Sequence, residues 1–204
     1  MSKPIRVFFK KIGRAKYISH LDLQKTMQRA LKRAALPVWE TEGFNPHVYL
    51  TFALPLSLGI ESVYESFDIK MNEDIDTDEI RDRLNETLTE DLIIIKAASP
   101  VYKHTEIKEA VYELIMENAE EFREFMNREE IIITKKTKKG ETQIDIKPLI
   151  KLKEIKDNKI TLILPAGTDL NLNPIQVITA FGLDLCDVKV TRTAVFCADG
   201  NEFI

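Results

Sequence analysis

The chain has 204 residues, of which 44% are hydrophobic and 30% are charged, and a formal net charge of −4. This composition excludes an intrinsically disordered chain. The chain is long enough to form one hydrophobic core, or two small cores packed together. The longest apolar runs, Leu92 to Ile95 and Ile160 to Leu164, are far shorter than the roughly 20 residues of a membrane-spanning helix. The first residues do not resemble a signal peptide. We therefore expect a cytoplasmic protein with no membrane partner.

The net charge conceals a strong segregation along the chain. Residues 1–50 hold ten Lys and Arg against three Asp and Glu, residues 51–130 hold eight against twenty-one, and residues 131–163 hold nine against four. Two basic segments thus frame an acidic middle. Basic surfaces attract phosphate backbones, although the lysine run at 135–139 is equally typical of a solvated hairpin tip.

The first half alternates strand and helix patterns. Period-two alternation, turn residues and helical spacing predict strands at 5–11, 48–54, 63–71 and 92–98 and helices at 19–35 and 77–87. This order is β-α-β-β-α-β. It predicts the ferredoxin-like, split βαβ arrangement, in which two helices cover one face of a four-stranded antiparallel sheet.

The first predicted helix has a capped start and two distinct faces. Ser19 with Asp22 three residues later is typical of an N-cap. The buried stripe is predicted to consist of Leu23, Met27, Ala30, Leu31 and Ala34. The opposite face is predicted to carry Lys25, Arg29, Lys32 and Arg33.

The second half reuses similar parts in a looser order. The predicted elements are strands at 110–116, 131–136, 142–147, 150–155, 159–164 and 186–196, an acidic helix at 118–128 and a short helix from Asn173 to Gly182. We therefore interpret residues 1–104 and 105–204 as two α+β halves, both ferredoxin-like, with antiparallel sheets and helices on one face. No low-complexity linker separates them, and we expect a shared interface.

Several ordered motifs of the first half resemble a known family. They are Arg14 to Gln24, Arg29-Ala30-Leu31, Gly43 to His47, Ala53 to Leu56 with Gly59, and Glu61-Ser62 with Glu65. They closely resemble the radical SAM-linked domain family of unknown function, here as a standalone member, and the second half matches more weakly. Members of that family occur fused to a radical SAM enzyme or alone, near genes for an E/G-type ribonuclease and ribosomal proteins. The resemblance implies a setting in RNA modification or processing.

Cysteine chemistry limits what the chain itself can do. A radical SAM iron–sulfur cluster needs three closely spaced thiolates, whereas this chain has only Cys186 and Cys197. No Cys-x-x-Cys pair is present for a structural zinc site. We therefore expect no metal and no cofactor, and we predict that both cysteines are apolar packing groups.

Two histidines stand in positions typical of ligand contacts. His20 follows the predicted cap, where it can bind a phosphate or act as an acid or base, or instead lie half-buried against a carbonyl. His47 follows the turn-forming Asn45-Pro46, and Phe44 is either an exposed ring for base stacking or a core side chain. We expect an ion pair of Glu61 or Glu65 with Arg14 or Lys16 to organise the basic loop before the helix. The two histidines are the candidate catalytic residues.

Three functions fit these residues. The first is an RNA-binding module in which His20, Phe44, Asn45 and His47 form a specific pocket. Its predicted phosphate contacts are Arg14, Lys16, Lys25, Arg29, Lys32, Arg33, Lys135, Lys136, Lys138 and Lys139.

The other two functions belong to different classes. A metal-independent RNA-cleaving or RNA-modifying enzyme is similar to the repeat-associated RNA endonucleases, but this chain lacks a glycine-rich loop near its C-terminus. A protein that docks on a radical SAM enzyme would use the acidic segment 106–130 as its docking face. The RNA-binding module is the function that we favour, with docking as the alternative.

Overall fold

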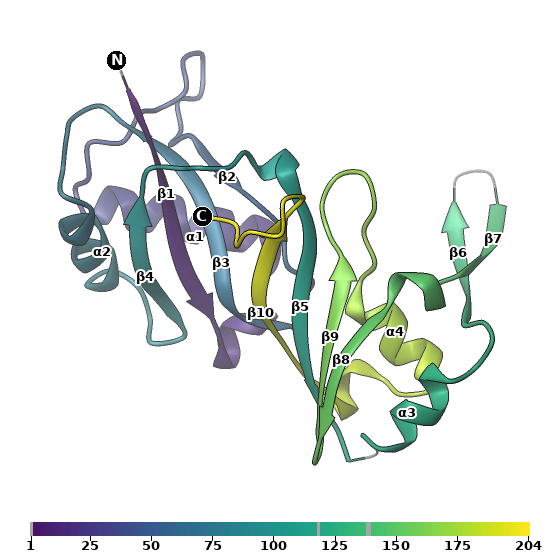
Figure 1. Cartoon of the computed structure of the whole chain (residues 1–204). Helices are drawn as coiled ribbons and strands as arrows, with labels where there is room; N and C mark the ends of the chain where they lie inside the picture. The colour runs from purple at the N-terminus through teal and green to yellow at the C-terminus, as the bar shows by residue number, and fades with distance from the viewer. Residues whose placement is uncertain (1, 118, 138–139) are drawn as a thin grey trace. The chain divides into compact units, whose positions relative to one another are not determined.

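The computed structural model describes residues 2–117, 119–137 and 140–204 of the chain. The fold is a mixed α+β fold that divides into two compact units, one comprising the residues up to His104 with Phe203 and Ile204, and the other residues 105–202 (Figure 1). No described helix is long and apolar enough to cross a membrane. Lys138 and Lys139 of the predicted lysine run lie outside the described residues.

The first unit is an antiparallel sheet with two helices. Its elements are β1 (Lys3–Lys11), α1 (His20–Arg33), β2 (Leu50–Phe52), β3 (Glu61–Met71), α2 (Thr77–Asn85) and β4 (Leu92–Ala98), with a 3-10 helix at Gly13–Tyr17. β1 pairs with both β4 and β3, and β2 pairs with the outer side of β3. The order strand, helix, strand, strand, helix, strand is the one that the sequence predicts.

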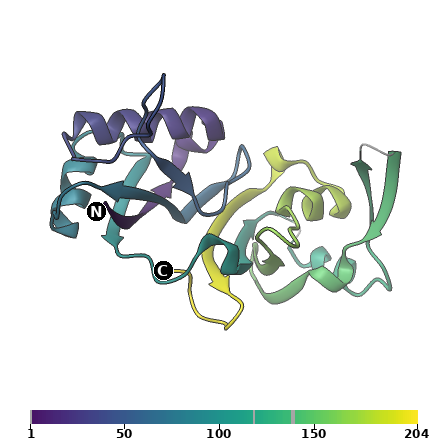
Figure 2. The ribbon, with the colours of Figure 1, turned by 90° about the horizontal axis from the view of Figure 1, so that it is seen from above.

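Helix α1 packs its apolar stripe against this sheet, and Figure 2 shows it lying along one face. Leu23, Met27, Ala30 and Leu31 are all buried. Together with Ala34 they join a core that includes residues of β1, β3 and α2, as their spacing predicts. The side chain of Ser19 accepts a hydrogen bond from the Asp22 amide, which confirms the predicted cap and satisfies one of the open donors at the helix start.

The second unit repeats the arrangement of the first. Its elements are a 3-10 helix at His104–Glu106 on the boundary, then β5 (Ile107–Ile115), α3 (Glu121–Met126), β6 (Ile132–Thr137), β7 (Gly140–Asp145), β8 (Lys151–Lys156), β9 (Lys159–Pro165), α4 (Pro174–Phe181) and β10 (Lys189–Cys197). β5 pairs with β10 and β9, and β8 pairs with the outer side of β9. When the separate β6–β7 hairpin is set aside, element order and pairing match those of the first unit.

One segment of the first unit differs from its prediction. The strand predicted at 48–54 is reduced to Leu50–Phe52, and the chain before it folds back on itself. Single bridges join Val38 to Met71 and Glu40 to Val48, and the Tyr49 amide donates to the carbonyl oxygen of Trp39 at 3.1 Å. We call residues 38–49 the arm. It extends from the edge of the sheet beside β3.

A buried arginine ties the end of the chain to the first unit. Arg6 in β1 is 1% exposed, and its guanidinium donates two hydrogen bonds to Asp68 in β3, at 2.7 and 2.9 Å. It also donates to the carbonyl oxygen of Ile204 at 3.0 Å and lies 4.0 Å from the centre of the Phe203 ring. Asp68 therefore compensates a charge that water does not reach.

Asp68→Asn should lower the free energy of unfolding by about 2–4 kcal/mol, because it leaves the buried guanidinium without its counter-charge. The matched control is Asp74→Asn, which removes the exposed partner of another β1 cation, Lys3. This control should change the free energy of unfolding by about 0.5 kcal/mol or less. Urea denaturation followed by circular dichroism measures both. Equal effects of the two variants would contradict the role given to Arg6.

Candidate nucleic-acid interface

Side chains of two neighbouring segments anchor the turn that leads into α1. Lys11, which is buried, donates from its ammonium group to the carbonyl oxygens of Lys16 and Ile18, at 3.5 and 3.2 Å. Asp91 accepts a hydrogen bond from the Arg14 amide at 3.1 Å, and a Cβ added at Gly13 would lie 2.4 Å from that carboxylate. These contacts hold the 3-10 turn before α1 close to the sheet.

Hydrogen bonds to α1 and within the arm hold the arm in place. Gln28 Nε2 donates to the carbonyl oxygen of Val48 at 2.9 Å, which couples the helix to the returning side of the arm. Within the arm, the Thr41 amide donates to the carbonyl oxygen of His47 at 2.8 Å, and the His47 amide donates to Thr41 Oγ1 at 3.2 Å. Val48 is completely buried in the core. The arm therefore has a defined position beside the helix.

A pocket of about 200 Å³ lies where the arm meets the helix. Its lining residues are Lys25, Gln28, Arg29, Lys32, His47 and Val48. The four helical residues are spaced by three and four positions, which places them on one face of α1. The pocket thus joins two parts of the sequence that the predictions treated separately, the basic helix face and His47.

The pocket carries an excess of positive charge. Lys32 forms an ion pair with Glu40 of the arm at 2.7 Å. Lys25 and Arg29 are exposed, and neither forms a hydrogen bond or an ion pair with any residue that the structure describes. Two cations next to a histidine, with one neutralised lysine, form a site whose chemistry suits an anionic group such as a phosphate.

The contacts of His47 define which ring nitrogen is available. Nδ1 lies 3.1 Å from the carbonyl oxygen of Asn45 and 3.0 Å from Thr41 Oγ1. Because a carbonyl oxygen only accepts, this network assigns the hydrogen to Nδ1. Nε2 has no partner in the described part of the chain, so it is the nitrogen that an outside group can reach.

Phe44 and Asn45 form the tip of the arm. Gly43 has a φ of +126°, a backbone conformation that side chains rarely adopt, and this allows the sharp tip. The Phe44 ring is fully exposed to solvent, so the interpretation of Phe44 as a core side chain is wrong. In the sequence, Asn45 and Pro46 separate Phe44 from His47, which lines the pocket.

The chain matches one family model over residues 4–174, that of the "Uncharacterized protein conserved in bacteria (DUF2344)". The chain belongs to this family. No curated protein matches it. The DUF2344 match contains all of α1, the arm and the pocket between them.

Other predicted site residues of this DUF2344 chain lie outside the pocket. His20 is exposed at the first position of α1 and packs edge-on against Phe52, with 5.0 Å between ring centres; that it forms one binding pocket with His47 stays a prediction. Arg33 donates to the carbonyl oxygen of Thr87 at 2.8 Å. The periodicity that grouped it with Arg29 missed this contact to the end of α2.

The loop before α1 contains two of the predicted phosphate contacts. Arg14 is 4.0 Å from the Asp91 carboxylate, and the Lys16 ammonium lies 5.2 Å from the centre of the Tyr17 ring. Both glutamates of the predicted ion pair, Glu61 and Glu65, are buried in β3, and their pairing with these cations stays a prediction. Arg14 also lines a separate cavity of about 560 Å³ with residues 89–91.

The second unit contributes the predicted lysine hairpin. Lys135 is exposed on β6, and the backbone register of the hairpin places residue 135 opposite residue 142 and residue 136 opposite residue 141. Lys138 and Lys139 lie outside the described residues. The involvement of this hairpin in an interface stays a prediction.

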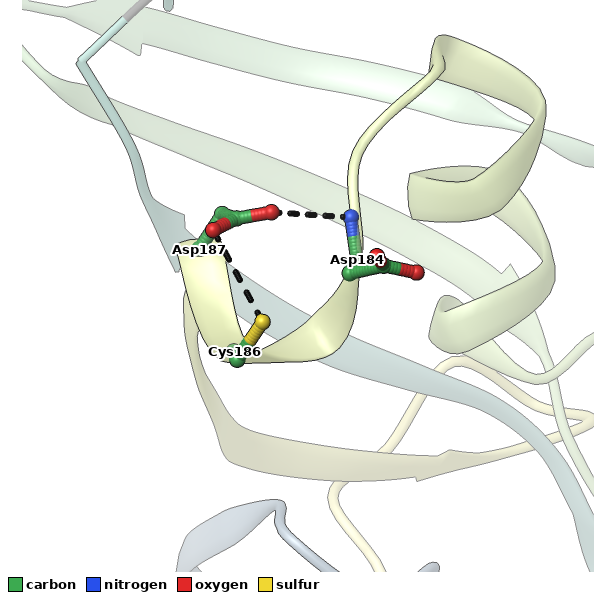
Figure 3. A group of neighbouring side chains, drawn as sticks. All are labelled: Asp184, Cys186 and Asp187. Atoms are coloured by element: carbon green, nitrogen blue, oxygen red, sulfur yellow. Dashed lines mark hydrogen bonds between the residues drawn. The ribbon is translucent and has the colours of Figure 1, made fainter.

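Three polar side chains gather beside β10 in the second unit (Figure 3). Ligand atoms of Asp184, Cys186 and Asp187 lie within 4.8 Å of one another, all on exposed residues. The Asp187 carboxylate accepts two hydrogen bonds from its neighbours, one from the Asp184 amide at 3.1 Å and one from the Cys186 thiol at 3.7 Å. These bonds cap a short turn and account for the cluster without a metal ion. The prediction that both cysteines are packing groups holds for the buried Cys197 and is wrong for Cys186.

Asp187→Asn should speed alkylation of Cys186. The charge of Asp187 is the largest cause that raises the pKa of the Cys186 thiol, followed by burial, so less of the thiol is present as the reactive thiolate at pH 8. Removing the charge lowers that pKa and should raise the rate of reaction with iodoacetamide about two- to fivefold. The asparagine oxygen can still accept from the Asp184 amide, which preserves the turn.

Cys186→Ser provides the control for this measurement, because the buried Cys197 should then react only after unfolding. Mass spectrometry follows the alkylation of Cys186 over time. If Cys186 in Asp187→Asn reacts no faster than in the unmodified chain, the charge of Asp187 is not what raises the pKa of the thiol.

Proposed function

We propose that this DUF2344 protein is an RNA-binding accessory protein in RNA modification or processing, and that it holds RNA phosphates in the pocket between α1 and the arm. The observation that carries the proposal is the convergence of Lys25 and Arg29, which lack partners in the described structure, with His47, whose Nε2 is left to accept a hydrogen bond from a ribose 2′-hydroxyl. The fully exposed Phe44, three residues before His47 in the arm, supplies a ring of the kind on which unpaired RNA bases stack.

Charge and geometry both support a phosphate ligand. The lining lysine and arginine side chains come from one face of a rigid helix, and Gln28 and Val48 hold the arm against that helix. A fixed site of this kind loses little conformational freedom when it binds, which favours affinity. Because RNA binding to such cations releases counterions, the affinity should fall steeply as salt rises.

The proposal treats each unit as a ferredoxin-like module. In both units the first strand of the repeat pairs with the third and the fourth, and the second pairs with the outer side of the third. Two helices follow the first and third strands. This is the connectivity of the split βαβ arrangement, and it supports the ferredoxin-like interpretation of the sequence.

The link to radical SAM enzymes belongs to the same proposal. The protein would act in the cytoplasm as a partner that presents RNA to a radical SAM enzyme, since its own two cysteines cannot hold the cluster. The motifs that support this link are those of α1, the arm and the start of β3.

A second candidate function is docking on a protein, and a specific cavity of the second unit favours it. Glu121, Glu124 and Arg128 surround a pocket of about 550 Å³ that also contacts Phe125 and Phe181. It lies in the acidic segment that the sequence assigned to a docking face, and its exposed glutamates suit a basic segment of a partner protein. Docking and RNA binding use different units and are compatible.

Arg29→Gln should weaken binding to single-stranded RNA about tenfold at low salt, because it removes a charge-assisted contact to phosphate. It should also reduce the slope of log affinity against log salt by roughly 0.7. The measurement is fluorescence anisotropy of a labelled 12-nucleotide RNA at several salt concentrations.

Arg33→Gln is the matched control, because it removes the same charge from the same helix outside the pocket. It should change affinity less than threefold. Equal losses in the two variants would show that only overall charge matters and would contradict the pocket. No binding of the unmodified chain at low salt would reject RNA binding and leave docking, whereas cleaved RNA would indicate the enzyme, with His47 as the candidate base.

A further inference from the structure

The arm carries a group of aromatic rings on its other side. The rings of Trp39 and Tyr49 lie 5.8 Å apart at 64°, edge to face. The ammonium group of Lys70 in β3 lies 4.9 Å from the centre of the Trp39 ring and 4.8 Å from that of the Tyr49 ring. We call these three residues the aromatic cluster.

The position of the cluster follows from strand alternation. Val48 and Leu50, on either side of Tyr49, are buried in the core beneath α1, and so are Val38 before Trp39 and Ile69 before Lys70. Successive side chains of an extended chain point to opposite faces. Trp39, Tyr49 and Lys70 therefore lie on the face that is turned away from α1.

The cluster is not part of the hydrophobic core. Neither ring belongs to the buried cluster of the first unit, and all three side chains are partly exposed. Trp39 is also the only tryptophan of the chain. Two large, partly exposed rings with a cation beside them have the components of a surface that stacks bases and holds the adjoining phosphate.

We infer that the aromatic cluster is a base-stacking site for single-stranded RNA, and that a strand crossing the arm places its phosphates in the α1 pocket and its bases on Trp39 and Tyr49. This inference rests on the proposed RNA-binding function and adds to it a preference for single-stranded over double-stranded RNA, which we call the strand preference. Both sides belong to one short arm, whose two halves are joined by the Tyr49–Trp39 and Thr41–His47 backbone bonds. Unpaired bases can reach exposed rings, whereas the bases of a duplex are stacked inside it.

The fluorescence of Trp39 tests the inference directly, because no other tryptophan contributes. An unlabelled 12-nucleotide single-stranded RNA should quench this fluorescence in a saturable way, and the same sequence as a duplex should not. Tyr49→Ala should weaken binding of the single strand about 5- to 30-fold, the range typical of losing one stacked base. Its salt slope should equal that of the unmodified chain, because no charge is lost.

Two further variants keep the test independent of folding. Tyr49→Phe retains the ring and should bind within twofold of the unmodified chain, whereas Tyr49→Leu retains apolar bulk without the ring and should bind as weakly as Tyr49→Ala. Circular dichroism checks that each variant is folded.

The possible results separate the two proposals. Saturable binding that leaves Trp39 fluorescence unchanged, or that Tyr49→Leu does not weaken, would overturn the stacking site while the α1 pocket stands. Equal quenching by single strand and duplex would overturn the strand preference. No binding of the unmodified chain at low salt would overturn the proposed function, and the stacking site with it.

Discussion

The structure of the candidate interface depends on the packing of α1, because one helix can bury only one stripe of its surface. Leu23, Met27 and Leu31 lie in the core of the first unit, and this fixes the rotation of the helix about its axis. Lys25 and Arg29 must then point away from the sheet. The hydrophobic effect, which holds the helix in place, thus also orients the cations that have no partner in the described chain.

The arm gives this cationic face its second wall. A hydrogen bond from Gln28 to the carbonyl oxygen of Val48 and an ion pair between Lys32 and Glu40 join the helix to the arm, and Val48 is buried in the core. Tyr49, the residue after Val48, therefore faces away from the core beneath α1, while His47 is one of the residues that line the pocket. One short segment therefore separates a site suited to phosphates from a site suited to bases, without any change in the main fold.

The sequence predicts what local periodicity determines and misses what distant contacts determine. The cap, the buried stripe and the cationic face of α1 follow from spacing along one helix. The arm was missed because isolated bridges, and no long alternating strand, hold it together. The roles of Asp91 and Arg33 depend on partners 77 and 54 residues away. In the second unit, the β6–β7 hairpin is inserted into an element order that otherwise repeats that of the first unit.

The most direct test of the account is to map where bound RNA touches the chain. A single-stranded RNA containing 4-thiouridine would be crosslinked to the unmodified chain by light, and the attached peptides would be identified by mass spectrometry. We expect the crosslinks to fall on the arm, residues 38–49, with Trp39, Phe44 and Tyr49 as the main attachment points. Crosslinks confined to the second unit, with none on the arm or α1, would contradict the account.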